Sequence, residues 1–199
     1  MDTINQIKEL LKDRDPMPLG VENSAWLHAA VLMPLFKDET GYKVLFTKRT
    51  DKVEHHKGQI SFPGGAVDDV DESLEETALR ESYEEIGLLK KDIHILGQLD
   101  DTTTAVSDFI VHPFVGYIPY PYDFKINPKE VDRIITVPFD VFLFDQSPYK
   151  RDKAEFEDYV YKGTSYYYNG DVIWGATARI TENFVNIVGD KLSLSNGEN

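Results

Sequence analysis

Three glutamates within five residues, Glu81, Glu84 and Glu85, are the side chains best suited to do chemistry. On a helix that turns about 100° per residue, Glu81 and Glu85 lie side by side and Glu84 flanks them. Carboxylates on one stripe repel each other, and a divalent cation with oxygen ligands would offset that repulsion. The spacing therefore predicts a metal-binding stripe. The alternative is a solvated acidic helix face, the usual outcome for a run of charges.

The neighbouring residues indicate how the helix that carries the three glutamates is positioned. Gly64 and Gly65 form a flexible loop ahead of the helix, and Gly87 is placed to end it. The helix must also bury one side against a core. On the side away from the acids we expect Leu79, Tyr83 and Ile86 to do so.

This stretch resembles the Nudix box, in which a glycine loop is followed by a fixed pattern of glutamates and an arginine. The matching residues are Glu72, Arg80, Glu81, Glu84, Glu85, Gly87 and Leu88. The chain departs from the common pattern at two points. Six residues rather than five separate Gly65 from Glu72, and Ser82 occupies a position that is usually hydrophobic.

The preceding run, residues 45–65, resembles the signature upstream of the box in Nudix coenzyme A pyrophosphatases. Glu54 stands where that signature has a second arginine. The matching residues are Leu45, Thr47, Arg49, Gly58, Phe62, Pro63, Gly64 and Gly65.

Composition restricts the class of protein. The chain has 199 residues, 41% of them hydrophobic and 12% aromatic, which indicates one folded domain with a sizeable core. There is no cysteine, so a thiolate zinc site is excluded. A net charge of −14 disfavours nucleic-acid binding, and no apolar run approaches membrane-spanning length. We therefore expect a cytoplasmic protein. A local excess of positive charge that could receive an anionic substrate comprises Lys43, Lys48, Arg49, Lys52 and Lys57.

Hydrophobic patterns predict strands before and after the central helix and further helices near both ends. The expected fold is an α/β sandwich around a mixed β-sheet, as the Nudix resemblance also implies. Residues 1–20 are expected to form a helix and linker, 21–190 a single Nudix domain, and 191–199 a frayed tail. Asn169-Gly170 predicts a hairpin, and Asp100 and Asp101 are interpreted as turn residues. Strands are expected at 26–36, 42–46, 93–99, 110–118 and 134–137, and the outer helices at 3–13 and 175–188.

The resemblance implies a role for each site residue. Glu81 and Glu85 are expected as the primary ligands of Mg²⁺ or Mn²⁺, with Glu84 as a further ligand or the proton acceptor. The general base is open among Glu84, Glu81 and Glu130. The other expected members are Arg80, which would orient a helix glutamate, Gly65, which would offer a main-chain carbonyl to the metal, and Arg49 and Lys57, which would contact substrate phosphate.

The activity implied is metal-dependent hydrolysis of the diphosphate of coenzyme A or its derivatives, to 3′,5′-ADP and 4′-phosphopantetheine. Two alternatives remain: a Nudix pyrophosphatase acting on ADP-ribose or nucleoside triphosphates, and a non-catalytic nucleotide-binding module. The partner expected is a small molecule, neither nucleic acid nor membrane. The oligomeric state stays open, with a homodimer among the candidates.

Overall fold

The computed structural model describes residues 2–12, 14–19, 26–50, 58–104, 108–143, 147–156 and 159–192. Its helices are α1 (Thr3–Lys12), α2 (Leu74–Ile86) and α3 (Gly175–Val188), with short 3-10 turns η1 (Lys90–Asp92), η2 (Phe139–Val141) and η3 (Gly189–Lys191). Its strands are β1 (Leu27–Asp38), β2 (Gly41–Arg49), β3 (Ile60–Ser61), β4 (Gly64–Ala66), β5 (His94–Gln98), β6 (Thr102–Thr103), β7 (Phe109–Tyr117), β8 (Val131–Pro138), β9 (Lys150–Glu155), β10 (Val160–Tyr168) and β11 (Asp171–Ile173).

A mixed sheet of eight strands forms the centre of the molecule. Its main order is β3-β2-β1-β7-β5, with β4 added to β1, β6 to β7 and β8 to β2. Strands β1 and β7 run parallel over nine residue pairs, whereas the other pairs in this sheet are antiparallel. The predicted mixed sheet is therefore present, and its strands β1 and β2 form an antiparallel hairpin.

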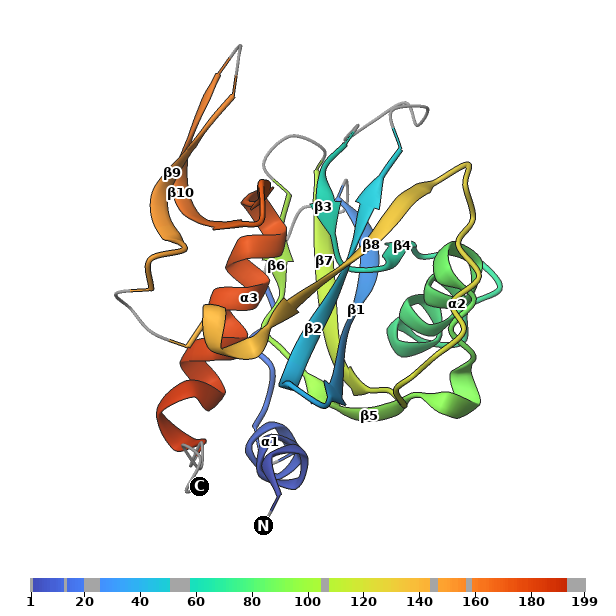
Figure 1. Cartoon of the computed structure of the whole chain (residues 1–199). Helices are drawn as coiled ribbons and strands as arrows, with labels where there is room; N and C mark the ends of the chain where they lie inside the picture. Colours follow the sequence, from blue (N-terminus) through green and yellow to red (C-terminus); the bar gives the residue numbers. More distant parts are fainter. Residues whose placement is uncertain are drawn as a thin grey trace.

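Helices cover both faces of this sheet (Figure 1). Ala78 and Ile86 of α2 pack on one face, in the same cluster as Ala30, Leu32 and Leu45 of the sheet. On the other face, α1 and α3 share a larger core, to which they contribute Ile7, Leu11, Ala178, Ile180, Phe184 and Val188. The fold is thus the predicted α/β sandwich. Among the described residues, no helix combines the length and apolar character needed to cross a membrane.

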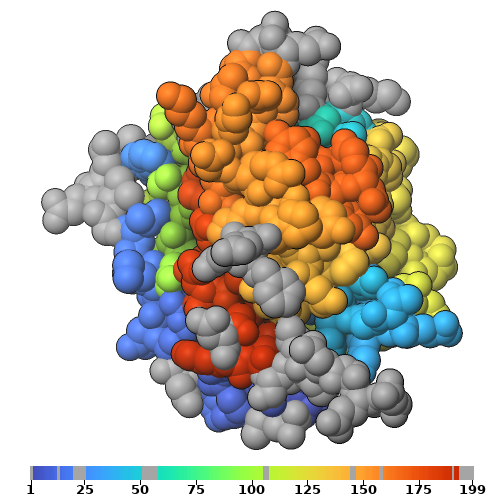
Figure 2. Space-filling view, turned by 60° about the vertical axis from the view of Figure 1, so that its left-hand side comes forward, coloured from blue at the N-terminus to red at the C-terminus, as the bar shows by residue number. Residues whose placement is uncertain are grey.

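A second, three-stranded sheet of order β11-β10-β9 packs beside α3 (Figures 1 and 2). Its β10–β11 turn is the predicted Asn169-Gly170 hairpin, where both residues take positive φ values of 50° and 83°. The sheet is tied to the central one by Asp171, which accepts hydrogen bonds from Arg133 Nη2 at 2.7 and 2.9 Å.

Candidate active site

The local sequence fixes both ends of α2 and hence the direction of its acidic side chains. At the start, the Ser73 hydroxyl accepts a hydrogen bond from the Glu76 N–H at 3.2 Å, which is an N-cap. At the end, Gly87 takes a left-handed conformation (φ 70°), and its N–H bonds back to the Ser82 and Tyr83 carbonyls. Ser82 is fully buried, and its hydroxyl donates to the Ala78 carbonyl at 2.7 Å. That bond explains how a polar residue occupies the usually hydrophobic position.

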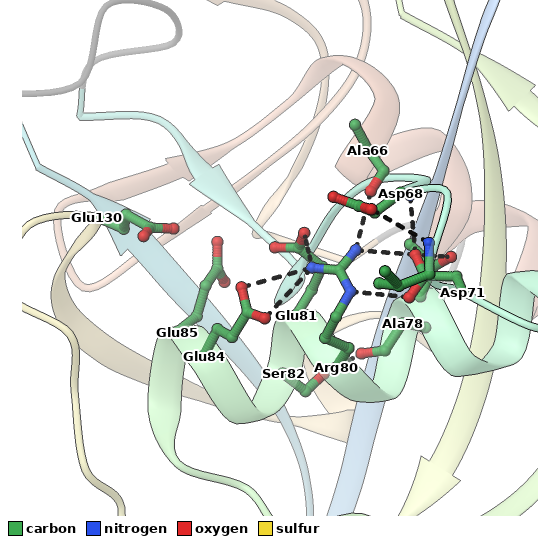
Figure 3. Close-up of polar contacts among 12 residues, drawn as sticks. Ala66, Asp68, Asp71, Ala78, Arg80, Glu81, Ser82, Glu84, Glu85 and Glu130 are labelled. Carbon is green, nitrogen blue, oxygen red and sulfur yellow. Dashed lines mark hydrogen bonds and ion pairs between the residues drawn. The ribbon is translucent and has the colours of Figure 1, made fainter.

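Arg80 is the hub of the acidic cluster (Figure 3). Its Nη1 donates to Glu81 Oε1 at 2.6 Å and reaches the Glu84 carboxylate at 3.4 Å. Its Nη2 also bonds to the Ala66 carbonyl at 3.1 Å, at the end of β4. Arg80 therefore joins the end of β4 to two of the three glutamates.

Asp71, which the sequence analysis did not single out, anchors Arg80. Its two carboxylate oxygens accept from Arg80 Nε and Nη2 at 2.8 and 2.9 Å, and one of them also accepts from the Thr77 hydroxyl at 2.8 Å. These bonds, from Arg80 above all, hold the pKa of Asp71 well below its usual range. Glu72, the residue that matched the box, is exposed beside Lys90. The extra loop residue thus leaves Asp71, rather than Glu72, paired with the arginine.

We expect Asp71→Asn to reduce kcat/KM about 10- to 100-fold, because Arg80 loses the charged partner that fixes its orientation. Glu72→Gln, a matched change at the neighbouring position, should leave kcat/KM within about twofold. Steady-state hydrolysis assays on the two variants provide the comparison. A larger loss of kcat/KM in Glu72→Gln than in Asp71→Asn would show that Glu72, and not Asp71, fixes the orientation of Arg80.

Glu85 is the most deeply buried acid of the helix, with only 1% of its surface exposed. Its Oε1 lies 3.5 Å from Arg49 Nη1, a long contact, and its buried Oε2 has no hydrogen-bond partner. Arg49 Nε is buried and unpartnered as well. Burial, together with the nearby charges of Glu81 and Glu130, raises the pKa of Glu85 to about 8, although Arg49 acts in the opposite direction. Arg49 and Glu85 thus each keep one buried polar atom without a hydrogen-bond partner.

Gly64 and Gly65, expected in a flexible loop, instead belong to the short strand β4, because their main chain pairs with β1. This strand lies directly against Glu81. A Cβ placed on Gly65 would lie 2.5 Å from the Glu81 carboxyl carbon, so only glycine leaves room for this carboxylate beside the main chain. Gly64 pairs with Val31 of β1, which holds β4 in the sheet. Burial also raises the pKa of Glu81, against the effect of Arg80. The main chain of β4 and the Glu81 carboxylate therefore face one another at close range.

These residues fit a hard divalent cation. The groups that face β4 offer oxygen ligands, and one of them is a buried carboxylate oxygen of Glu85 without a hydrogen-bond partner. Burial raises the pKa of both Glu81 and Glu85, and a bound cation would favour their charged forms. Within the described part of the chain, however, no three carboxylate or imidazole groups already converge on one point. The reason is visible in the contacts: Glu81 and Glu84 are drawn to Arg80, and Glu85 is drawn to Arg49. Binding a cation would exchange these contacts for metal–oxygen bonds.

The buried carboxylate predicts how stability depends on pH when no metal is present. The pKa of Glu85 rises from about 4.5 unfolded to about 8 folded, so the folded state keeps a proton that the unfolded state releases. The free energy of unfolding should therefore fall between these pH values, by up to about 1.4 kcal/mol per pH unit from this group. Urea unfolding in EDTA at pH 5, 6, 7 and 8 measures the slope, and Glu85→Gln removes this contribution. If the free energy of unfolding depended on pH equally in the wild type and in Glu85→Gln, burial would not raise the pKa of Glu85.

The remaining predicted residues are placed as follows. Glu130 accepts a hydrogen bond from Asn127 Nδ2 at 2.9 Å, and its charge raises the pKa of both Glu81 and Glu85, so it belongs to the same cluster (Figure 3). Lys57 lies outside the described residues. The described members of the basic patch have separate partners: Lys43 pairs with Asp38, Lys48 with Asp171 and Arg49 with Glu85. Lys52, like Lys57, lies outside the described residues.

The helix face was predicted incorrectly at one residue. Leu79 and Ile86 are buried, but Tyr83 is 56% exposed. The apolar side of α2 is centred on Ala78 and Ile86, and Tyr83 lies at its margin, beside the loop that follows β7.

The structure is an α/β sandwich with acids clustered on one helix, and comparison with known proteins gives the family. The NUDIX domain matches residues 26–160, and the chain belongs to the Nudix family of hydrolases, which act on phosphorus-containing anhydrides. Enzymes of this family generally use divalent cations such as Mg²⁺ or Mn²⁺.

Two curated relatives are similar over most of their length. The "Uncharacterized Nudix hydrolase NudL" of Yersinia enterocolitica is 38% identical over 181 residues, which cover 89% of each chain. The protein of the same description from Photorhabdus laumondii is 35% identical over 153 residues, 77% of this chain and 80% of the relative. A solved MutT/nudix family protein from Enterococcus faecalis superimposes with a TM-score of 0.60 at 18% identity, covering 90% of this chain and 66% of its own, a likeness of fold.

Proposed function

We propose that this Nudix hydrolase cleaves the diphosphate of coenzyme A or its derivatives, with Mg²⁺ or Mn²⁺, to 3′,5′-ADP and 4′-phosphopantetheine. The observation that carries the proposal is the contact of Arg49 Nη1 with Glu85 Oε1 at 3.5 Å. It joins the upstream stretch, which resembles the coenzyme A signature, to the most deeply buried acid of the box. A specificity element and the hydrolytic site are therefore adjacent.

The cluster supplies the groups that hydrolysis requires. Glu81, Glu85 and the main-chain carbonyl of Gly65 would hold the cation, with Glu84 completing the oxygen set or accepting the proton of the attacking water. When bound, the cation supplies positive charge beside the phosphoryl oxygens and makes a water molecule more acidic. Water oxygen bonds to one phosphorus, and the bridging oxygen leaves with the other phosphate.

The arginines have separate tasks in this scheme. Arg80 keeps Glu81 and Glu84 oriented through the contacts described above, and Asp71 fixes Arg80 in turn. Arg49, released from Glu85 when the cation binds, would turn its guanidinium to the substrate diphosphate, with Lys57 as a second cationic group. Glu130 is the remaining acid close enough to influence proton transfer, and it is kept in place by Asn127.

Product analysis tests the substrate assignment. Purified protein is incubated with Mg²⁺ or Mn²⁺ and, in separate reactions, with coenzyme A, ADP-ribose and a panel of nucleoside triphosphates. We expect release of 3′,5′-ADP from coenzyme A, with kcat/KM at least about tenfold above the other substrates. Preference for ADP-ribose or a triphosphate would retain the metal chemistry and overturn the coenzyme A assignment. Tight binding of these compounds without any turnover would favour a nucleotide-binding module instead.

A further inference from the structure

A cleft of about 580 Å³ opens beside the carboxyl-terminal end of α2, next to the acidic cluster. One wall is the end of α2 with the segment that follows it, and the other is the loop between β7 and β8. The lining residues are Tyr83, Glu84, Gly87, Leu89, Asp92, Tyr122, Asp123 and Lys125.

The cleft is held open by fixed contacts between its two walls. The N–H groups of Lys125 and Asn127 donate to the carbonyls of Ile86 and Glu85 at 2.9 and 2.8 Å. Across the other end, the Tyr122 hydroxyl accepts from the Leu89 N–H and donates to Asp92, both at 3.0 Å. The loop is therefore fastened to the helix that carries Glu85, and the cleft is formed before any ligand arrives.

The cleft joins the hydrolytic site through one residue. Glu84 lines the cleft and is also held by Arg80 in the acidic cluster, with its side chain half exposed between them. A substrate whose diphosphate lies at Glu81, Glu84 and Glu85 would extend one of its two arms into this space. The neighbouring backbone bond from Asn127 to Glu85 places the loop wall at the same end of the site.

The side chains that line the cleft indicate which of the two substrate arms it would bind. Tyr83 and Leu89 present apolar surface to solvent, with 56% and 39% of their area exposed. The charged groups are three carboxylates, of Glu84, Asp92 and Asp123, and one ammonium, Lys125, which is already paired with Asp123. Three negative charges and one positive charge leave a balance of −2, which repels a further phosphate. An uncharged, largely apolar arm fits such a surface.

We propose that this cleft binds the pantetheine arm of the substrate, together with any acyl group attached to its sulfur, whereas the phosphorylated nucleoside lies elsewhere. The inference rests on the coenzyme A activity proposed above and deepens it by assigning the two halves of the substrate. Tyr83 and Leu89 pack against the methyl and methylene groups of the arm. They are specificity residues and take no part in the chemistry.

The test compares Tyr83→Ala and Leu89→Ala with the wild type. We expect the KM for coenzyme A and for a medium-chain acyl derivative to rise about fivefold or more in each variant. The inhibition constant of 3′,5′-ADP, which lacks the arm, should stay within about twofold. Tyr159→Ala is the matched control, because Tyr159 is 47% exposed and directly precedes β10. The β9–β10 hairpin lies on the other side of the molecule from α2 (Figure 1).

Each other outcome has a distinct meaning. Unchanged KM values in both variants, in a wild type that cleaves coenzyme A, would overturn the cleft assignment and leave the proposed function intact. A parallel rise in the inhibition constant of 3′,5′-ADP would place the nucleoside in the cleft and would also overturn it. Absence of coenzyme A cleavage by the wild type itself would overturn the proposed function and this inference together.

Discussion

Glu85→Gln should fold normally and lose at least about 100-fold in kcat, because the variant lacks one of the two proposed primary carboxylate ligands. Glutamine keeps the size and shape of the side chain, but its neutral amide is a weak ligand for Mg²⁺ or Mn²⁺. The site around residue 85 is closed, with 1% exposure, so no other acid of the described chain has room to replace it without repacking. Steady-state hydrolysis at saturating Mg²⁺ measures the loss.

A second assay separates lost chemistry from lost folding. In EDTA at pH 8 the same variant should unfold at a higher temperature than the wild type, since it no longer buries a carboxylate whose pKa is about 8. Each kcal/mol is worth about 2–4 °C in a domain of this size. Glu75→Gln is the matched control: Glu75 lies in the first turn of α2, away from the cluster, and its substitution should preserve activity. Wild-type turnover in Glu85→Gln would refute the ligand role.

Gly65→Ala should reduce hydrolysis about 100-fold while leaving the fold intact. The added Cβ would meet the Glu81 carboxylate at 2.5 Å, and a flexible side-chain end of this kind moves aside easily. The free energy of unfolding should therefore change by no more than about 1 kcal/mol. Displacing a ligand by about 1 Å is enough to account for the loss of rate.

The preceding glycine provides the contrast. In Gly64→Ala the new Cβ would collide with the Ala30 carbonyl oxygen and lie 2.6 Å from Val31 Cα, and φ is +156°. Neither backbone atom can move without disturbing β1, so this variant should lose about 1–3 kcal/mol of stability. Thermal unfolding and hydrolysis measured on both variants resolve the two roles. Equal destabilisation by the two substitutions would contradict the view that a Cβ at residue 65 displaces only the end of the Glu81 side chain.

The elements that could be predicted from sequence are those with a local signal. The α2 helix has a period, an N-cap and a stop glycine, and the Asn169-Gly170 turn has the residues that tolerate positive φ. The acids of the stripe follow from spacing along that one helix. That these acids lie close together could therefore be predicted without knowing the rest of the fold.

The partners that depend on the path of a loop or on tertiary packing could not be predicted. The box pattern is defined by residue spacing and therefore selects Glu72. The path of the chain ahead of α2 decides which acid contacts Arg80, and that acid is Asp71. Asp100, interpreted as a turn residue, in fact accepts from Arg14 Nη2 at 2.5 Å and from Asn183 Nδ2 at 2.7 Å. It thereby ties the segment after α1 to α3. Such contacts depend on how the two faces of the sheet are covered, for which the linear sequence carries no periodic signal.

The exposed position of Tyr83 has the same origin. A helical wheel separates an acidic side from an apolar side, but it does not say how wide the contact with the sheet is. In the structure the contact extends over Ala78 and Ile86 and stops short of Tyr83, which faces the β7–β8 loop instead. The residue that the pattern assigned to the core is therefore available for binding.

A crystal structure with Mn²⁺, located by its anomalous scattering, would show whether the acidic cluster of α2 holds the metal ion. We expect an ion bound by carboxylate oxygens of Glu81 and Glu85 at about 2.1 Å, beside the Gly65 carbonyl, with Arg49 no longer in contact with Glu85. An ion bound elsewhere, or no ion while Glu81 stays on Arg80 and Glu85 on Arg49, would contradict this expectation.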